Sequence, residues 1–455
     1  MEAPFIRYVG DPFVDTGAAV LEHRIGKACE EFLPEDIERQ GNELQEIYSQ
    51  RGWRSILAIH FPNSGWTNPN MGQAKVAAYY KKVLSGFNED VQQGRFCEYC
   101  RRPANTLVDG STIPLLSNAN SMDCGAGGRT GFGVCGYCLF AVQFYPLATL
   151  KIEGRALFWW SPDRQWTYLL AGIAVREVNR FLAVSPEGTI NPKFPRTQLL
   201  RVAREAFTEW SNQPDRIPLR DIIGCRSTNY RTEPEFDELR MPKALFEFWY
   251  EAASGYGATY DALVAAAWEA KAPKKNQKGI GKSEWQRRNG LYEALGKAFQ
   301  ADDFGQAIRA AMRYFIRIEG KKVRPGSFGL ACLFLERLAG MTKLRIDAIR
   351  EIADQVSKSS ASKKLLTRLF ESPTNFTDWL VYAQRTIEKA GEPCFRFDSI
   401  LAALDMVSED DSMPRDFWLV RNLIILRALE AVDDSVSQEL PEPVLQSAVN
   451  DDKEG

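Results

Sequence analysis

The chain has 455 residues, of which 45% are hydrophobic and 25% are charged, and its formal net charge at pH 7 is −2. This length is sufficient for two or three domains of roughly 100–200 residues each. The near-neutral charge does not decide for or against a nucleic-acid partner, because only local clusters of charge bear on that question. No segment approaches the ~18 apolar residues of a membrane span, and no secretory signal is evident. We therefore expect a cytoplasmic protein without a membrane partner.

The first 95 residues have a mixed pattern. Gly10-Asp11-Pro12 marks a turn, and Phe13 to Lys27 has the apolar spacing of a short helix. The segment Trp53 to His60 predicts a strand that runs into a polar loop, Pro62 to Asn70. Residues 71–85 again have a helical pattern. This part of the chain therefore predicts an α+β domain.

Four of the nine cysteines form the sharpest motif in the sequence. They lie in two Cys-x-x-Cys pairs, Cys97 with Cys100 and Cys135 with Cys138, within an element that spans residues 96–140. Two such turns can bring four thiolates around one ion, so we predict a tetrahedral zinc site. The zinc is predicted to be structural, because no position remains for water or substrate. A redox pair would need only one of the two motifs, and four unrelated buried cysteines are a weaker alternative.

The rest of the chain changes from mixed to helical. Strands are predicted over Leu147 to Trp160 and Trp166 to Ile173, and a helix over Arg196 to Ser211. Beyond residue 240, apolar residues recur at helical spacing between Pro and Gly breakers. The predicted helical segments are 243–270, 284–300, 304–319, 327–357, 361–372, 375–390, 396–406 and 413–432. The predicted order is an N-terminal α+β domain with the inserted zinc element over 1–240, a transition helix and basic linker over 241–283, a C-terminal helical bundle over 284–432, and a disordered acidic tail over 433–455.

Common catalytic constellations are missing from the sequence. It holds two histidines, His23 and His60, which leaves no convincing histidine-based nuclease or hydrolase site. No Walker A motif occurs, and the glycine-rich stretch from Gly125 to Gly131 lacks the Lys-Ser/Thr ending of a phosphate loop. We therefore expect no catalytic residue and a chain that is not an enzyme.

Basic and polar segments suggest contact with nucleic acid. The segment Ala270 to Arg288, which includes the linker, is rich in basic residues and is interrupted by one aromatic residue, Trp285, and smaller basic clusters follow in the helical half. Lysine and arginine side chains bind phosphates through counterion release, although a solvated linker would have the same composition. The basic candidates are Arg129, Lys274, Lys275, Lys278, Lys282, Arg287, Arg288, Lys321 and Lys322, with a further cluster at Lys358, Lys363, Lys364 and Arg368.

The polar loop after the predicted strand is a second candidate. Asn63, Ser64, Trp66 and Asn68 combine carboxamides, a hydroxyl and an indole. Asn can pair with adenine, and Trp can stack on or wedge between bases. A capped turn explains the same residues equally well.

Three segments resemble the Cas eight family, the large subunits of type I-B CRISPR Cascade. They are Gly10 to Gly17, Asn63 to Pro69, and Ile113 to Asn118, and the two cysteine pairs fit the zinc element of that family. The resemblance covers about the first 140 residues. It departs from the family pattern at Asp11, where Asn is expected, and at Gly65-Trp66, where a Pro-aromatic pair is typical.

The resemblance implies a subunit of a crRNA-guided DNA-surveillance complex, whose guide reads the target sequence by base pairing. Such a subunit contacts the crRNA 5′ handle, recognises the protospacer-adjacent motif, aids duplex opening and R-loop formation, and recruits an effector. The implied partners are crRNA, target double-stranded DNA and its displaced strand, the subunits Cas five, Cas seven, Cas six and a small subunit, and a helicase-nuclease or transposon-targeting proteins. Asn118 joins the loop residues as a candidate nucleic-acid contact.

Two other functions remain open from the sequence. One is a zinc-stapled, metal-dependent nuclease or nucleotidyltransferase whose carboxylates the pattern does not reveal. The other is a zinc-bearing adaptor that binds only proteins. Metal-dependent cleavage would indicate the first, and the absence of salt-sensitive nucleic-acid binding would favour the second.

Overall fold

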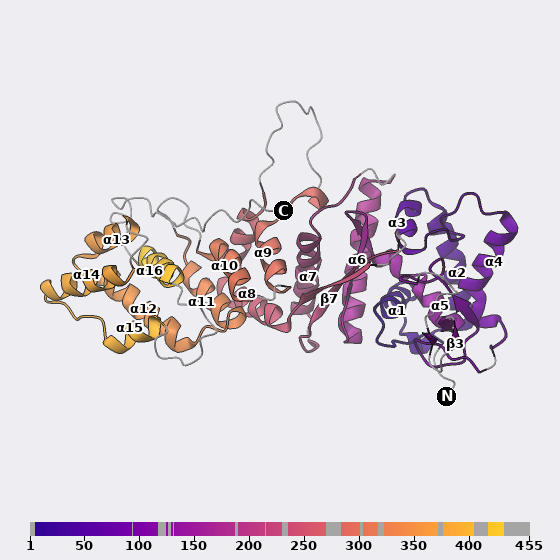
Figure 1. Ribbon diagram of the computed structural model, residues 1–455, viewed down its shortest axis with the longest axis horizontal. Coiled ribbons are helices and arrows are strands. Elements are labelled where there is room, and N and C mark those ends of the chain that lie inside the picture. Colours follow the sequence, from indigo (N-terminus) through magenta and orange to yellow (C-terminus); the bar gives the residue numbers. More distant parts are fainter. Residues whose placement is uncertain are drawn as a thin grey trace, which may run out of the picture. The chain divides into compact units, whose positions relative to one another are not determined.

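The computed structural model describes residues 5–92, 94–116, 124–125, 129–130, 132–186, 190–213, 215–229, 235–269, 284–300, 304–316, 323–371, 376–404 and 417–431. The chain forms two compact units (Figure 1). The first comprises Met1–Lys243 with Glu269–Gln300, and the second comprises Ala244–Trp268 with Ala301–Gly455. The protein is mixed α/β and mainly helical, with small sheets confined, among the described residues, to the first unit.

Helices dominate the first unit. Its α-helices are α1 (Pro12–Ile25), α2 (Pro34–Ser49), α3 (Trp53–His60), α4 (Gln73–Ser85), α5 (Gly136–Val142), α6 (Arg164–Val184), α7 (Pro195–Ser211) and α9 (Gly290–Ala298), and its short 3-10 helices are η1 (Cys29–Glu31), η2 (Gly86–Asn88), η3 (Tyr145–Ala148) and η4 (Glu284–Gln286). Helix α1 lies at the centre and packs on both α5 and α6. Its close approach to α5 requires Gly17, since a Cβ there would lie 1.9 Å from the Ala141 carbonyl oxygen. The predicted helices over Phe13 to Lys27, 71–85 and Arg196 to Ser211 are confirmed as α1, α4 and α7.

The main sheet of the first unit is antiparallel and has four strands in the order β5–β6–β7–β8. Its strands are β5 (Leu150–Ile152), β6 (Arg155–Trp160), β7 (Ile222–Thr228) and β8 (Glu235–Met241). Helix α7 packs on this sheet, where the Trp159 indole nitrogen donates to the Leu199 carbonyl oxygen at 3.1 Å. Gly224 pairs with Trp159 and leaves room for Leu199, whose Cδ1 would lie 2.3 Å from a Cβ at that position. Two-stranded pairs join β1 (Thr106–Val108) to β4 (Phe132–Val134) and β2 (Cys124–Gly125) to β3 (Arg129–Thr130).

Two predicted strands are wrong, because both segments are helical. Residues Trp53 to His60 form α3, in which Trp53, Ile56 and Leu57 are buried while Arg54 and Ser55 are exposed. This burial recurs at positions i, i+3 and i+4, as expected for an amphipathic helix. Residues 166–173 belong to α6, whose start is fixed by Asp163, since its carboxylate accepts hydrogen bonds from the Gln165 and Trp166 amides.

The predicted strand over Leu147 to Trp160 is in fact a short 3-10 turn followed by a hairpin. Strands β5 and β6 pair antiparallel, with Leu150 opposite Leu157 and Ile152 opposite Arg155. The turn between them places Glu153 at φ 53° and Gly154 at φ 80°. Glycine adopts such positive φ values without strain, so Gly154 marks the chain reversal.

The second unit consists of helices and their connections, with no strand among its described residues. The helices are α8 (Lys243–Ala266), α10 (Phe304–Phe315), α11 (Ser327–Leu338), α12 (Lys343–Lys358), α13 (Ser362–Glu371), α14 (Phe376–Lys389), α15 (Phe397–Ala403) and α16 (Phe417–Ala431). Helix α16 packs on α11, α12, α13 and α14, and its Leu423, Ile424 and Leu426 are fully buried. Helix α8 bends at Tyr256, whose φ of −140° is not helical.

The predicted start of the C-terminal bundle at residue 284 needs correction. Residues Glu269–Gln300 belong to the first unit, where α9 packs on α7. The buried Glu293 carboxylate accepts hydrogen bonds from the Thr197 amide at 2.9 Å and from the Thr197 hydroxyl at 2.7 Å. The bulk of the basic linker (270–283) and the acidic tail (433–455) lie outside the described residues. Among the helices of the described ranges, none is long and apolar enough to cross a lipid bilayer.

Candidate metal centre

The four paired cysteines converge in a small element of the first unit. Strands β1 and β4 pair with Thr106 opposite Val134 and Val108 opposite Phe132, which brings the two Cys-x-x-Cys turns together. The first turn is closed by the Cys97 amide, which donates to the Arg102 carbonyl oxygen at 2.6 Å. The second turn begins α5, because Cys135 is the N-cap residue of that helix. The long separation in sequence is therefore bridged by one antiparallel strand pair.

The four sulfur atoms lie close enough together to bind one metal ion, and their spacing is compatible with zinc. The Sγ atoms of Cys97, Cys100, Cys135 and Cys138 lie within 4.8 Å of one another, and all four residues are buried. The Cys100 and Cys135 sulfurs are 3.5 Å apart. Zinc–sulfur bonds of about 2.3 Å in a tetrahedron place the sulfurs roughly 3.8 Å apart, so the cluster fits this ion. Four thiolates would complete the tetrahedral coordination, which is typical of a structural site.

The sulfurs also interact with one another. Hydrogen bonds from Cys135, Cys138 and Cys97 lower the pKa of the Cys100 thiol, whereas a hydrogen bond shared with Cys100 raises the pKa of Cys138. The Cys138 amide lies 3.5 Å from the Cys135 sulfur, as a donor to it. The pKa of Cys97 is also lowered, to about 7, because its hydrogen bond with Cys100, which raises the pKa, is outweighed by those with Cys135 and Cys138. Cys100 and Cys97 are therefore favoured as thiolates, whereas Cys135 and Cys138 retain protons, which a bound cation would displace.

Aromatic and basic side chains surround the cysteine element. The Arg102 guanidinium donates to the Phe5 carbonyl oxygen at 2.7 Å, and Arg7 donates to the Cys100 carbonyl oxygen. The Tyr137 ring stacks on Phe87 at a centroid distance of 5.0 Å. At Gly136 a Cβ would lie 2.0 Å from the Phe87 amide nitrogen. Only glycine therefore fits at this position, where the start of α5 packs against η2. The N-terminal residues Phe5 and Arg7 thus contact the first turn, and Phe87 contacts the second.

The predicted nucleic-acid loop has a buried half and an exposed half. Ser64 is fully buried, and Trp66 is 8% exposed, with its indole nitrogen donating to Gln143 Oε1 at 3.1 Å. The rings of Tyr48 and Tyr80 pack against Trp66. Trp66 and Ser64 therefore support the core in this conformation, in place of the predicted contact with a base.

The two asparagines of the same loop face outward. Asn63 is exposed and has a left-handed backbone with φ 57°, a conformation that Asn adopts more readily than most residues. Asn68 is half-buried, and its side-chain oxygen accepts a hydrogen bond from the Asn70 amide at 3.0 Å. Of the four predicted loop contacts, Asn63 is exposed and Asn68 is partly exposed, whereas Ser64 and Trp66 are buried.

The basic residues that follow the linker are largely engaged within the first unit. Arg288 forms an ion pair with Glu269 at 2.8 Å, and Arg287 is half-buried. Trp285, the aromatic residue that interrupts the predicted basic segment, is 2% exposed and donates from its indole nitrogen to Glu177 Oε1 at 2.5 Å. Trp285 and Arg288, which follow the linker, are therefore bound to other residues of the first unit. The other predicted contacts, Asn118, Lys274, Lys275, Lys278, Lys282, Lys321, Lys322 and the side chain of Arg129, lie outside the described residues.

Neither histidine lies at an open site. His60 is 1% exposed, its Nδ1 is hydrogen-bonded to the Tyr145 hydroxyl, and burial lowers its pKa to about 3. His23 stacks on Tyr168 at 3.8 Å, and its Nε2 lies 2.7 Å from the Tyr168 carbonyl oxygen. The contacts of both histidines thus indicate a structural role.

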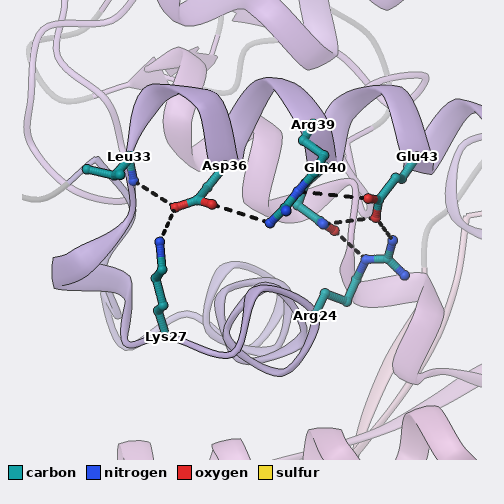
Figure 2. Close-up of polar contacts among 7 residues, drawn as sticks. All are labelled: Arg24, Lys27, Leu33, Asp36, Arg39, Gln40 and Glu43. Atoms are coloured by element: carbon teal, nitrogen blue, oxygen red, sulfur yellow. Dashed lines mark hydrogen bonds and ion pairs between the residues drawn. The ribbon is translucent and has the colours of Figure 1, made fainter.

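Helices α1 and α2 carry a dense set of charged side chains, which Figure 2 shows. Asp36 accepts hydrogen bonds from the Leu33 amide at 3.1 Å and from Lys27 at 3.0 Å. Glu43 pairs with Arg24 at 2.6 Å and with Arg39 at 3.9 Å. Each of the three cations in this α1–α2 network has a carboxylate within 4 Å, so a ligand would have to break an existing ion pair to bind there.

Tyr382 is a half-buried residue that the sequence pattern did not single out. Tyr382 on α14 lies beside the Arg368 guanidinium of α13, at 4.0 Å from the ring centroid. Arg368 belonged to a predicted basic cluster, but nothing in the local pattern links it to a tyrosine fourteen positions further along the chain. The helical spacing of Tyr382, Arg385 and Lys389 was the available signal.

Comparisons with models of protein families, with curated proteins and with solved structures found no match.

Proposed function

We propose that this chain is the non-catalytic, zinc-stapled large subunit of a crRNA-guided DNA-surveillance complex of the Cascade type. In this role it contacts the crRNA 5′ handle, recognises the protospacer-adjacent motif, aids duplex opening and recruits a downstream helicase-nuclease or transposition proteins. The proposal rests on the three resembling segments, on the cysteine element and on the asparagine loop. The observation that supports the proposal most is the structural connection between the cysteine element and the asparagine loop.

Helix α5 joins the metal centre to the loop. Its N-cap is the zinc ligand Cys135, and its C-cap is Gln143, which accepts the hydrogen bond of the Trp66 indole. The Gln143 amide nitrogen also donates to the Thr112 carbonyl oxygen at 2.9 Å. A metal at one end of a short helix therefore helps to fix a loop at the other end, and preorganised contacts lose less entropy on binding.

The chemistry of the loop suits the edges of bases. The Asn63 and Asn68 side chains each carry one acceptor and two donors, and the buried Trp66 holds the backbone between them. We assign Asn63 and Asn68 as the residues that contact the flanking duplex, with Trp66 and Ser64 as their support.

The nuclease alternative needs a cluster of metal-binding carboxylates or histidines. Within the part of the chain that the structure describes, the four cysteines form the one group of three or more such residues close enough to share an ion. Because their site is filled by protein sulfurs, it has no open position for a catalytic water. This arrangement favours a structural metal over a catalytic one.

Co-expression tests the proposal directly. The chain is expressed with its neighbouring operon subunits and a guide RNA, and the purified sample is assayed for mass, RNA and zinc. We expect a large ribonucleoprotein with about one zinc per chain. A lone, zinc-bearing chain without RNA would contradict the proposal, and metal-dependent cleavage of DNA would establish the nuclease alternative.

A matched pair of variants tests the loop within that complex. Asn63→Gly keeps a residue that tolerates positive φ and removes the amide, and Asn70→Ala removes an exposed amide from the end of the same loop. We expect Asn63→Gly to weaken target binding at least tenfold and Asn70→Ala to leave it within twofold. Equal effects would contradict the assignment of Asn63.

A further inference from the structure

The second unit has a surface on which several basic side chains have no ion-pair partner among the described residues. Helices α13 and α14 pack together through buried residues, and the Trp379 indole nitrogen donates to the Leu365 carbonyl oxygen at 3.0 Å. Figure 1 shows these two helices close together beside α16. Their outer sides bear Lys364 and Arg368 on α13, and Tyr382, Arg385 and Lys389 on α14. We call these five residues the α13–α14 cationic face.

The aromatic ring of Tyr382 lies where the two helices meet. The Arg368 Cζ is 4.0 Å from the ring centroid, and the Lys364 Nζ is 5.9 Å from it. Lys364 and Arg368 are four residues apart and therefore project from one side of α13. The ring consequently receives cations from a neighbouring helix while remaining half-exposed to solvent.

Two further cations extend the same stripe along α14. Arg385 and Lys389 follow Tyr382 by three and seven residues, which places all three on one side of the helix. Both are exposed. In the described ranges, Lys364, Arg368, Arg385 and Lys389 have no ion-pair partner, although Glu371, Asp378 and Glu388 are exposed on the same helices.

Other arginines of this unit are neutralised by nearby acids. Arg396 pairs with Glu351 at 2.7 Å, and Arg427 pairs with Asp354 at 2.7 Å. Like charges four residues apart destabilise a helix, and both Lys364/Arg368 and Arg385/Lys389 have this spacing. Four cations without ion-pair partners among the described residues, two of them beside one aromatic ring, therefore indicate a polyanionic ligand.

We propose that the α13–α14 cationic face binds single-stranded nucleic acid, with the cations on phosphates and a base stacked on Tyr382. A positively charged track combined with an aromatic platform is the usual means of binding single strands without sequence preference. An acidic peptide would use the charges but has no base for the ring. This inference deepens the proposed function. It rests on that function in one respect, because DNA opening by the guided complex would supply the single strand.

The test uses the full-length chain alone. Binding of fluorescent oligothymidine and oligouridine 20-mers is measured by anisotropy between 50 and 200 mM salt. The variant Lys364→Gln/Arg385→Gln/Lys389→Gln is compared with Arg54→Gln/Lys297→Gln/Lys343→Gln, which removes three exposed cations without ion-pair partners from other helices. Thermal unfolding of each variant shows whether it is folded.

The wild type is expected to bind at 50 mM salt, and the face variant to lose at least tenfold in affinity. Three lost phosphate contacts should reduce the slope of log K against log salt by about 2, at roughly 0.7 per contact for single strands. The control triple should keep the wild-type slope. Equal losses in the two triples, or no binding by the wild type, would overturn the inference.

A second pair of variants tests the ring. Tyr382→Leu should weaken binding about 5- to 100-fold, as expected for the loss of one stacked base, whereas Tyr382→Phe should remain within threefold of wild type. Equal affinities for Tyr382→Leu and wild type, together with displacement by polyglutamate, would overturn the proposal in favour of an acidic protein partner. Preference for the thymidine or the uridine oligomer identifies the strand as DNA or RNA.

The two proposals fail in different ways. If the chain binds single strands through this face but does not assemble with guide RNA, the inference is supported and the guided complex is contradicted. If the complex assembles but the two triple variants bind single strands equally well, the guided complex is supported and the role of this face is contradicted.

Discussion

The α1–α2 network and the α13–α14 cationic face both lie on pairs of packed helices, yet they treat charge in opposite ways. In the first, Asp36 and Glu43 receive Lys27, Arg39 and Arg24 within 4 Å (Figure 2). In the second, Lys364 and Arg368 lie 5.9 and 4.0 Å from the Tyr382 ring centroid, Arg385 and Lys389 follow on the same side of α14, and none of the four has an ion-pair partner among the described residues. A density of charged residues in the sequence therefore does not by itself mark a binding surface.

The difference shows what to look for in a basic cluster. When each cation has a carboxylate within reach, binding a phosphate must first break an existing ion pair. When the cations have none, a phosphate replaces only water and counterions. The same reasoning explains why Arg288, which is already paired with Glu269, is a weaker candidate than Arg385.

The two units also differ in how their folds are held. The first contains the four-cysteine cluster, whereas the described residues of the second hold no comparable group of metal ligands. Burial of apolar helix faces is therefore the main stabilising contribution in the second unit. Several perturbations should affect one unit and spare the other.

Removal of the metal should have the largest effect. In Cys135→Ser, or after chelation, we expect loss of zinc and destabilisation of the first unit by at least several kcal/mol, since structural zinc contributes about 10–16 kcal/mol in zinc-finger peptides. Hydrogen exchange should accelerate in α5 and β4 and remain unchanged in α12 and α16. Cys225→Ala, which changes a buried cysteine outside the cluster, is the control and should retain zinc. Zinc that persists in Cys135→Ser would show that the four sulfurs do not form the site.

Acid should destabilise the first unit through His60. Burial lowers the pKa of His60 from 6.5 to about 3, so the folded state favours the neutral ring. The associated stability is fully present above pH 6.5 and is lost progressively as the pH falls toward 3. At about 1.4 kcal/mol per pH unit, the loss between pH 6.5 and pH 4 is on the order of 3 kcal/mol.

His60→Gln isolates this effect, because glutamine does not titrate. Burial raises the pKa of Asp11 to about 6, which acts in the opposite direction, so the wild type must be compared with the variant at each pH. Urea unfolding at pH 7 and pH 4 should show a smaller pH-dependent loss in His60→Gln. Parallel losses in the two proteins would rule out His60 as the source.

The second unit contains a buried arginine, Arg421, which stabilises the end of α13. Arg421 is 1% exposed, and its guanidinium donates to the Leu369 carbonyl oxygen at 2.8 and 3.1 Å and to the Phe370 carbonyl oxygen at 3.3 Å. Arg421→Met would leave these carbonyl groups of the last α13 turn without that donor, which costs about 1–3 kcal/mol. We expect a lower unfolding midpoint for the second unit and faster exchange in α13. Arg350→Met, which breaks an exposed pair with Asp347, should cost less than 1 kcal/mol.

Local sequence was sufficient for the features that depend on spacing. The cysteine pairs predicted the metal-ligand cluster, because a Cys-x-x-Cys turn fixes two sulfurs wherever it occurs. Most helices of the second unit followed from the apolar period and its breakers, but the predicted segment 327–357 forms two helices, α11 and α12, because the chain breaks at residues 339–342. The eight residues of α3 were predicted as a strand, because a short apolar run fits either period and only packing decides between them.

Features that depend on distant partners were beyond the local pattern. Strand β8 is largely polar, with exposed Phe236, Asp237 and Glu238, and it is held by pairing with β7 and by an ion pair from Arg155 to Asp237. The burial of Trp66 depends on Gln143, and that of Trp285 depends on Glu177, so neither indole could be distinguished from an exposed one by its neighbours in sequence. Surface roles assigned from residue type alone therefore needed the tertiary contacts.

The smallest predicted effect sets the two charged surfaces directly against each other. Glu43→Gln removes the partner of Arg24 and Arg39, so we expect a loss of at most about 1 kcal/mol in the free energy of unfolding. Arg385→Gln/Lys389→Gln removes a repulsion between like charges four residues apart, so we expect no loss and a gain of about 0.2–0.5 kcal/mol. Denaturant unfolding at low salt measures both, and high salt should diminish both differences. If the double variant proved less stable than wild type, its cations would be contributing to the fold, and the α13–α14 cationic face would be no more open to a ligand than the α1–α2 network.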